Sequence, residues 1–276
     1  MRTGFTKAGW IGTALLLAGA SLPAQMRENT EKQLSCNNSG YDSSRARHCE
    51  MREQTLPAIG RLSVDGGTNG GASIKGWARN EVLVRARIET SAENEGAAAN
   101  LASRVTVDGN GGQVKATGPE SSHDSGWSVS YEIFVPHSTD LTMNANNGGV
   151  SVSDVRGQLR VQTRNGGVNL KRVEGDIQGE TANGGIDVEL AGASWNGRQM
   201  DLKTRNGGVQ VSLPSRASAN IVAETNLGGI QSDFPMPQSN SRERNRKVEF
   251  AVGAGGPPIH IATGNGGIRL KRIEAQ

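Results

Sequence analysis

The sequence has little of what most enzymes and metalloproteins need. Aromatic residues make up 4% of the 276 residues, and the four histidines lie far apart in the chain. None of them shows a metal-ligand spacing such as His-x-x-x-His, and no Gly-Lys-Ser/Thr phosphate loop or Gly-x-Ser-x-Gly nucleophile motif occurs. We therefore expect no cofactor, no metal site and no catalytic residue.

An excess of charge of one sign is also missing. The chain has 30 Lys and Arg against 27 Asp and Glu, and two of the basic residues, Arg2 and Lys7, lie in the first 24 residues, which we expect to be removed. Their removal lowers the formal net charge from +3 to +1. Because nucleic-acid binding relies on clustered Lys and Arg, we do not expect a nucleic-acid partner.

Long hydrophobic runs are confined to the N-terminus. Residues 1–24 combine two basic residues with an apolar stretch over residues 8–20, and they end on a small residue, Ala24, before Gln25. This pattern predicts a secretory signal peptide, with a retained membrane anchor as the alternative. We expect an exported protein without a transmembrane segment after cleavage, located in the periplasm, at the outer surface or outside the cell.

Only two cysteines are present, Cys36 and Cys49. Export would place them in a compartment where disulfides persist, so we expect them to pair. Free thiols and a metal-binding pair are the alternatives. Closing a loop this short would stabilise the fold by about 3 kcal/mol.

Glycine, by contrast, is abundant, with 38 residues, and much of it belongs to a repeat of Asn-Gly-Gly followed by Val or Ile. The five copies are Asn147-Gly148-Gly149, Asn165-Gly166-Gly167, Asn183-Gly184-Gly185, Asn206-Gly207-Gly208 and Asn265-Gly266-Gly267. Leu227-Gly228-Gly229 is a sixth, degenerate copy. Successive first glycines are 18, 18, 23, 21 and 38 residues apart, and the long last gap predicts a further coil and an insertion.

Apolar and polar residues alternate on both sides of each copy, which predicts strands. Val168 and Leu170, for example, flank the polar Asn169. We interpret each unit as a strand, an Asn-Gly-Gly corner and a second strand, stacked as an all-β β-solenoid of 18–23-residue coils. Glycine would supply positive φ at the corners, and the asparagines would form a ladder along one edge. The alternative is an antiparallel β-meander or sandwich with hairpins at Asn-Gly.

Four segments follow from these patterns. Residues 1–24 are the signal peptide, and residues 25–54 are a loosely ordered lead-in that the disulfide holds. Residues 55–137 form an N-terminal β-region or cap, and residues 138–276 form the repeat solenoid. Within the N-terminal region, the Ala-rich residues 95–103 predict a short helix, and residues 69–71 repeat the corner motif. We interpret this region either as the first coils carrying a helix or as a separate cap over unpaired strand edges.

Several segments together resemble a bacterial family of secreted β-solenoid proteins that is labelled putative adhesins, domain of unknown function 4097. These segments are residues 49–53, 76–77, 82–86 and 127–133 and the repeated Thr-x-Asn-Gly-Gly-Val. The resemblance covers nearly the whole mature chain and implies surface attachment, with no ligand or catalytic residue to carry over. The chain departs from the pattern at Leu227 and in the spacing before Gly266.

The sequence as a whole indicates a non-enzymatic envelope or secreted protein, an adhesin that binds a polysaccharide or a surface protein through shallow, repeated contacts. A periplasmic scaffold or signalling accessory is the first alternative. A carbohydrate-active enzyme is the second, although glycoside hydrolysis needs paired carboxyls and no outward column of the repeat stacks two acids. The oligomeric state is left open.

Overall fold

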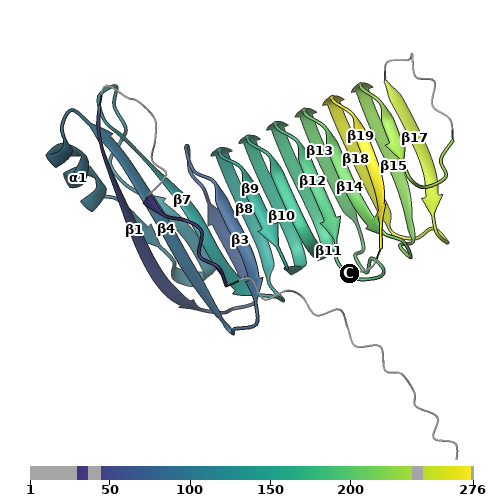
Figure 1. Ribbon diagram of the computed structural model, residues 1–276, viewed down its shortest axis with the longest axis horizontal. Coiled ribbons are helices and arrows are strands. Elements are labelled where there is room, and N and C mark those ends of the chain that lie inside the picture. Colours follow the sequence, from purple (N-terminus) through teal and green to yellow (C-terminus); the bar gives the residue numbers. More distant parts are fainter. Residues whose placement is uncertain (1–29, 37–44, 238–244, 275–276) are drawn as a thin grey trace, which may run out of the picture.

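The computed structural model describes residues 30–36, 45–237 and 245–274. The expected signal peptide, residues 1–24, lies outside these residues. The described chain is all-β apart from one short helix, α1 (Glu95–Ser103), and a 3-10 turn, η2 (Asn110–Gly112). Its strands join in one curled mixed sheet (Figure 1).

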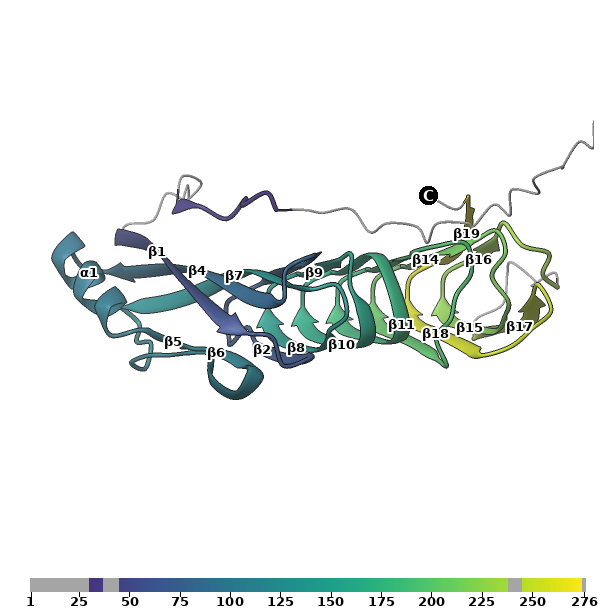
Figure 2. The same ribbon diagram turned by 90° about the horizontal axis from the view of Figure 1, so that it is seen from below.

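The curl gives the sheet two layers that face each other across the core (Figure 2). Layer A contains, in order of pairing, β1 (Ala46–Pro57), β4 (Glu81–Ala92), β7 (Gly126–Pro136), β3 (Ala72–Trp77), β9 (Val150–Ser153), β11 (Val168–Asn183), β12 (Ile186–Leu190), β14 (Val209–Pro214), β19 (Ile268–Ile273) and β16 (Ile230–Ser232). Layer B contains β5 (Thr106–Asp108), β6 (Gln113–Thr117), β2 (Arg61–Asp65), β8 (Asp140–Asn147), β10 (Arg156–Asn165), β11 again, β13 (Met200–Asn206), β18 (Pro258–Asn265), β15 (Ala219–Leu227) and β17 (Arg246–Val252).

The alternating pattern determines which side chains enter the core. Val168 and Leu170 are buried, whereas Asn169 between them is on the outer face of layer A. The same alternation in neighbouring coils creates one continuous apolar cluster between the layers. Its burial stabilises the stack by roughly 25 cal/mol per Å² of apolar surface removed from water.

Strands of the repeat pair in parallel and in register. Asn165 aligns with Asn147 on one side and with Asn183 on the other, and Val168 aligns in the same way with Val150. An antiparallel meander is therefore wrong for the repeat. Parallel registration brings chemically equivalent positions of successive coils into continuous rows.

The corner asparagines form one such row. Nδ2 of Asn165 donates a hydrogen bond of 2.7 Å to Oδ1 of Asn147, and Asn183 donates an equal bond to Asn165. The further rungs join Asn69, Asn206 and Asn265. Behind this row, the buried Thr181 hydroxyl donates to the carbonyl of Gly166 at 2.9 Å, so a threonine column reinforces each corner.

The last coils are not stacked in sequence order. The C-terminal pair β18 and β19 lies between the β13–β14 coil and the β15–β16 coil. The 38-residue gap before Gly266 contains β17, which pairs antiparallel with the far side of β15, rather than the additional coil expected from the spacing. After β17 the chain turns at Gly253, which has a φ of 61° and lies next to the residues that precede β15. A Cβ at Gly253 would lie 2.6 Å from the carbonyl oxygen of Ala217.

The N-terminal region combines the two interpretations left open by its sequence. β2, the corner at Asn69 and β3 form a first coil that pairs with β8 and β9. The chain between β3 and β8 forms an insertion that extends both layers and includes the helix predicted over residues 95–103. Residues 46–54, expected in a loosely ordered lead-in, instead form most of strand β1, because they pair along their whole length with β4.

At most corners the first glycine is required by close packing rather than by positive φ, contrary to our expectation; Gly207 and Gly228, each with a φ of 157°, combine the two. The backbone of Gly166 is outside the left-handed region, but a Cβ there would overlap the carbonyl oxygen of Gly148. The second glycine is less restricted, since a Cβ at Gly167 would lie 3.5 Å from the nearest atom, the carbonyl oxygen of Gly185.

The two glycines of one corner should therefore respond differently to alanine. Gly166→Ala is expected to lower the free energy of unfolding by about 3 kcal/mol, because the backbone of a neighbouring coil must move. Gly167→Ala, the matched control, is expected to change it by less than about 1 kcal/mol. Urea denaturation measures both values, and equal effects would contradict the packing explanation.

The degenerate corner offers a second test. Leu227 aligns with Asn265 and is half exposed, at the end of the asparagine row. Leu227→Asn would add a rung, so this variant should be more stable than Leu227→Ala by about 0.5–1 kcal/mol, the usual net value of a hydrogen bond. Thermal unfolding measures the difference, and equal stability of the two variants would contradict the expected extra hydrogen bond.

Candidate functional site

An open groove of about 700 Å³ runs along layer A beside the stacked corners. Its floor is free of side chains where the second glycine of each corner lies, at Gly149, Gly167, Gly185, Gly208 and Gly267. The repeat explains this hollow. The second glycine of each corner has no side chain, and the Val or Ile that follows it points into the core. The groove thus arises from the repeat itself.

One row of polar side chains lines the groove. It consists of Ser151, Asn169, Asp187, Gln210 and Arg269, called here the outer row. These residues are in register on five adjacent strands, β9, β11, β12, β14 and β19. Successive side chains are therefore spaced by the distance between strands, about 4.8 Å.

The outer row carries hydrogen-bonding capacity that the protein uses only in part. Gln210 donates to the two carboxylate oxygens of Asp187 at 3.2 and 3.4 Å. Oδ1 of Asn169 is buried and has no hydrogen-bond partner in the part of the chain that the structure describes. Arg269 is exposed, and its side chain forms no hydrogen bond or ion pair with the residues that the structure describes. The row offers a carboxylate, two amides and a guanidinium to a ligand.

This arrangement suits binding better than hydrolysis. Glycoside cleavage requires two carboxyl groups on either side of the scissile bond. Asp187 is the one carboxylate among the described residues that line the groove. The groove can therefore hold a ligand by hydrogen bonds, without a second acid to complete that chemistry.

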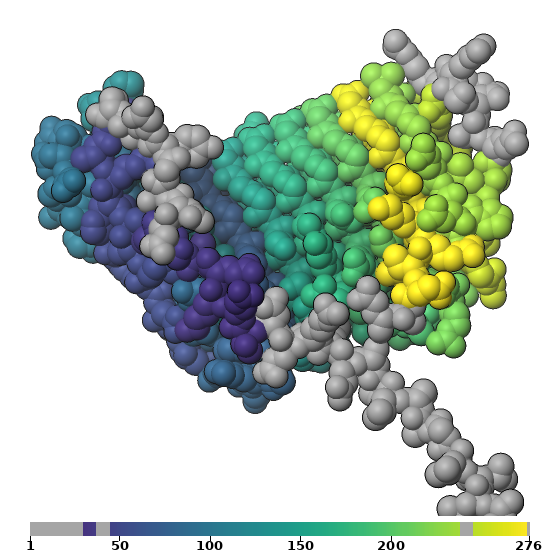
Figure 3. All heavy atoms as spheres, viewed as in Figure 1, coloured from purple at the N-terminus to yellow at the C-terminus, as the bar shows by residue number. Residues whose placement is uncertain are grey.

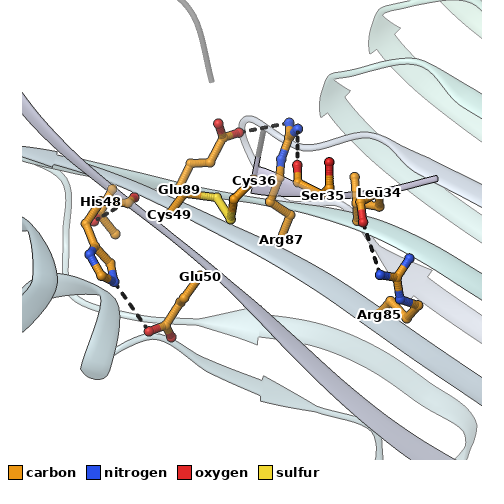
Figure 4. The surroundings of a disulfide bond; sticks show 10 residues. Leu34, Ser35, Cys36, His48, Cys49, Glu50, Arg85, Arg87 and Glu89 are labelled. Carbon is orange, nitrogen blue, oxygen red and sulfur yellow. Dashed lines mark hydrogen bonds and ion pairs between the residues drawn. A yellow bond between two sulfur atoms is a disulfide. The ribbon is translucent and has the colours of Figure 1, made fainter. Parts of the chain in front are cut away.

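At the N-terminal end of layer A, a segment of the chain itself lies on the same outer face. Residues 30–36, called here the strap, cross β3, β7, β4 and β1 (Figures 2 and 3). The strap ends at the disulfide between Cys36 and Cys49 of β1, with its sulfurs 2.02 Å apart. Figure 4 shows how Arg85 and Arg87 donate to the main-chain carbonyls of Leu34 and Ser35 beside this bond.

The strap covers a buried ion cluster. Glu132 is 2% exposed and accepts hydrogen bonds from Nζ of Lys75 at 2.9 Å and from the guanidinium of Arg85. The main-chain amides of Gln33 and Leu34 donate to the same carboxylate at 2.9 and 3.2 Å. Burial alone would raise the pKa of Glu132, but the hydrogen bonds from the Gln33 amide and from Lys75 outweigh it and hold this pKa below its usual value.

Other residues with possible chemistry do not form a comparable site. Nδ1 of His260 lies 3.2 Å from Asp201 on the outer face of layer B, and its Nε2 lies 4.0 Å from Glu224. Among the described residues, no group of three His, Cys, Asp or Glu side chains is placed to hold a metal ion. The same part of the chain contains no helix with the length and apolar character needed to span a bilayer.

The sequence identified the corners and the two cysteines, but not the ion cluster or the groove. Lys75 and Arg85 lie on consecutive strands, but Glu132 is 47 residues beyond Arg85, so no local pattern joins it to them. The outer row could have been partly recognised, because Ser151, Asn169, Asp187 and Gln210 occupy the same polar position after successive corners. Arg269 has the same position after its own corner, but its place beside Gln210 follows from the pairing of β19 with β14.

The curled mixed sheet with its one short helix defines an all-β architecture, and the sequence places it in a family. The chain belongs to the Toastrack DUF4097 family, which matches residues 20–271. No curated protein matches the chain.

Solved structures that are similar to it include a "putative cell adhesion protein" from Clostridium sporogenes, with 12% identity, a TM-score of 0.45 and coverage of 82% of this chain and 100% of the other. A "putative adhesin" from Bacteroides fragilis has 8% identity and a TM-score of 0.42, over 82% of this chain and 97% of the other. A "putative lipid binding protein" from Parabacteroides distasonis has 11% identity and a TM-score of 0.28, over 80% and 96%.

The ion cluster predicts a pH dependence of stability. Glu132→Gln should lower the free energy of unfolding at pH 7 by about 3 kcal/mol, because it leaves the buried Lys75 without its charged partner. Since the pKa of Glu132 is lower in the folded state, its contribution is complete above the unfolded value of about 4.3 and is lost as the pH falls through the folded value.

Urea denaturation between about pH 2.5 and pH 7 measures this effect. The pH is varied in steps of roughly 0.5 units around the usual pKa of a glutamate. The matched control is Glu53→Gln, because Glu53 forms similar ion pairs but is largely exposed, and it should cost at most about 1 kcal/mol. A Glu132→Gln variant with the wild-type pH profile would contradict the assignment.

Proposed function

We propose that this chain is an exported, non-enzymatic, adhesin-like protein that binds a polysaccharide or a protein at a cell surface. In this proposal residues 1–24 are a signal peptide and residues 55–137 an N-terminal β-region that contains the first coil and a cap. Residues 138–276 are a β-solenoid with Asn-Gly-Gly corners. The in-register parallel pairing and the asparagine row support the solenoid. Membership of the Toastrack DUF4097 family agrees with this architecture.

The observation that carries the binding function is the groove with its outer row. Five strands present polar side chains at equal spacing along a surface that is otherwise lined by glycine and by the backbone of the stack. A polymer lying along the groove would contact several rungs at once, and weak contacts at each rung would add together.

The disulfide supports the exported location. A cross-link between Cys36 and Cys49 persists in oxidising compartments and is rare in the cytosol. It fixes the strap to β1 and thereby keeps the buried ion cluster covered. The same bond is therefore expected to form only after the chain has left the reducing cytosol.

A binding assay on the mature chain, beginning at Gln25, tests the proposal. Wild type should be retained by cell-envelope fractions, and Gly149→Gln with Gly167→Gln should reduce retention about tenfold by filling the groove, a loss of about 1.4 kcal/mol. Both glycines leave space for a side chain, because their Cβ atoms would lie at least 3.5 Å from other atoms.

The matched control is Arg160→Ala with Gln162→Ala, two exposed positions on the outer face of layer B. It should retain wild-type binding. The proposal is overturned if envelope fractions do not retain the wild-type chain, if filling the groove has no effect, or if the chain turns over substrates on a glycan panel.

A further inference from the structure

The strap and the groove occupy the same line across layer A. Glu53, Arg85, Glu132 and Ser73 are paired in succession on β1, β4, β7 and β3, and Ser73 pairs with Ser151 of the outer row. The outer row is thus the continuation of the row that contains Glu132 and Arg85, two of the residues that hold the strap. Figure 2 shows the strap on the outside of layer A, the side on which the groove lies.

The protein binds its own strap mainly by main-chain groups, with two side-chain links: the ion pair between Lys32 and Glu53 and the disulfide between Cys36 and Cys49. The Glu132 carboxylate accepts from the amides of Gln33 and Leu34, and Nζ of Lys75 donates to the carbonyl of Glu31 at 2.9 Å. Arg85 and Arg87 donate to the carbonyls of Leu34 and Ser35 at 3.1 and 3.3 Å. These main-chain contacts do not depend on the strap's side chains, so this face of layer A can hold an extended polypeptide through its backbone.

The open part of the row offers the same kinds of groups. Asp187 is an acceptor like Glu132, and Arg269 is a donor like Arg85 and Arg87. Asn169 adds a side-chain amide between these groups, and its buried Oδ1 has no hydrogen-bond partner among the described residues. The strap contacts β3, β7 and β4 in turn and so crosses the strands, as a ligand lying along the groove would.

A polysaccharide matches this lining less well. Sugar rings commonly stack an apolar face on an aromatic side chain, and the described residues that line the groove include no Phe, Tyr or Trp. A carboxylate and a guanidinium on one row instead suit alternating amide donors and carbonyl acceptors.

We propose that the groove binds an extended polypeptide segment of a partner protein through its main-chain groups, as the same outer face of layer A binds the backbone of the strap. This inference rests on the proposed function and narrows its ligand to one class. The partner's sequence is then only loosely specified, because the backbone provides most of the contacts.

Phage displaying random dodecapeptides provide the probe. Panning on the wild-type mature chain, followed by counter-selection on the groove-filled Gly149→Gln, Gly167→Gln variant, should enrich clones whose synthetic peptides bind wild type at least about tenfold more tightly than that variant. Arg269→Ala, a single exposed substitution with little effect on folding, should weaken them about tenfold, the value of one charge-assisted hydrogen bond.

Two series of peptide variants distinguish main-chain from side-chain recognition. N-methylation of single amides in the bound stretch should weaken binding about tenfold, whereas alanine replacements at most positions should change it less than about threefold. The layer B variant Arg160→Ala with Gln162→Ala should bind the peptides as wild type does.

The inference is overturned if no groove-dependent clone is enriched, or if alanine replacement weakens binding and N-methylation does not. It is also overturned if groove-dependent retention by envelope fractions survives protease treatment but is lost after glycan removal. That last result would preserve the proposed adhesin function and assign its ligand to polysaccharide, so the two proposals fail separately.

Discussion

The close approach of one corner to the next is the constraint on which the rest of the structure depends. At Gly166 the space that a side chain would occupy contains the carbonyl of Gly148, and the same contact recurs from coil to coil. Because the corner cannot move away from its neighbour, equivalent residues must align. The asparagine row, the buried threonines and the outer row all follow from this alignment.

The ends of the stack show how the alignment is terminated. At the C-terminal end, β17 pairs antiparallel with β15 and gives layer B a different final strand. Leu227 lies in that last coil, where no further corner follows to continue the asparagine row. Its departure from the repeat therefore coincides with the place where an asparagine would have a partner on one side only.

At the other end, β4 and β7 extend layer A, and β1 is the edge strand of this layer.

Much of the fold was predictable because it depends on local pattern. The alternation around Asn169 gave the correct buried positions, and the Ala-rich residues 95–103 gave the helix. The order of the last coils was not predictable, since the motif at Asn265 matches any neighbouring corner equally well. Positive φ does not explain why most corners need glycine. The reason at Gly166 is a close contact with a residue 18 positions away, which a local pattern does not reveal.

The site was less predictable than the fold, for a physical reason. The stack fixes where the outer row lies but not which side chains occupy it, because those side chains point away from the core. The glycine floor is thus a consequence of folding, whereas Asp187 and Arg269 are free to differ without disturbing the coils. Binding specificity would accordingly reside in the outer row, and the buried Glu132 cluster shows what such a row does when a polypeptide lies across it. A scaffold built by repetition can in this way bind an extended chain with few specialised residues.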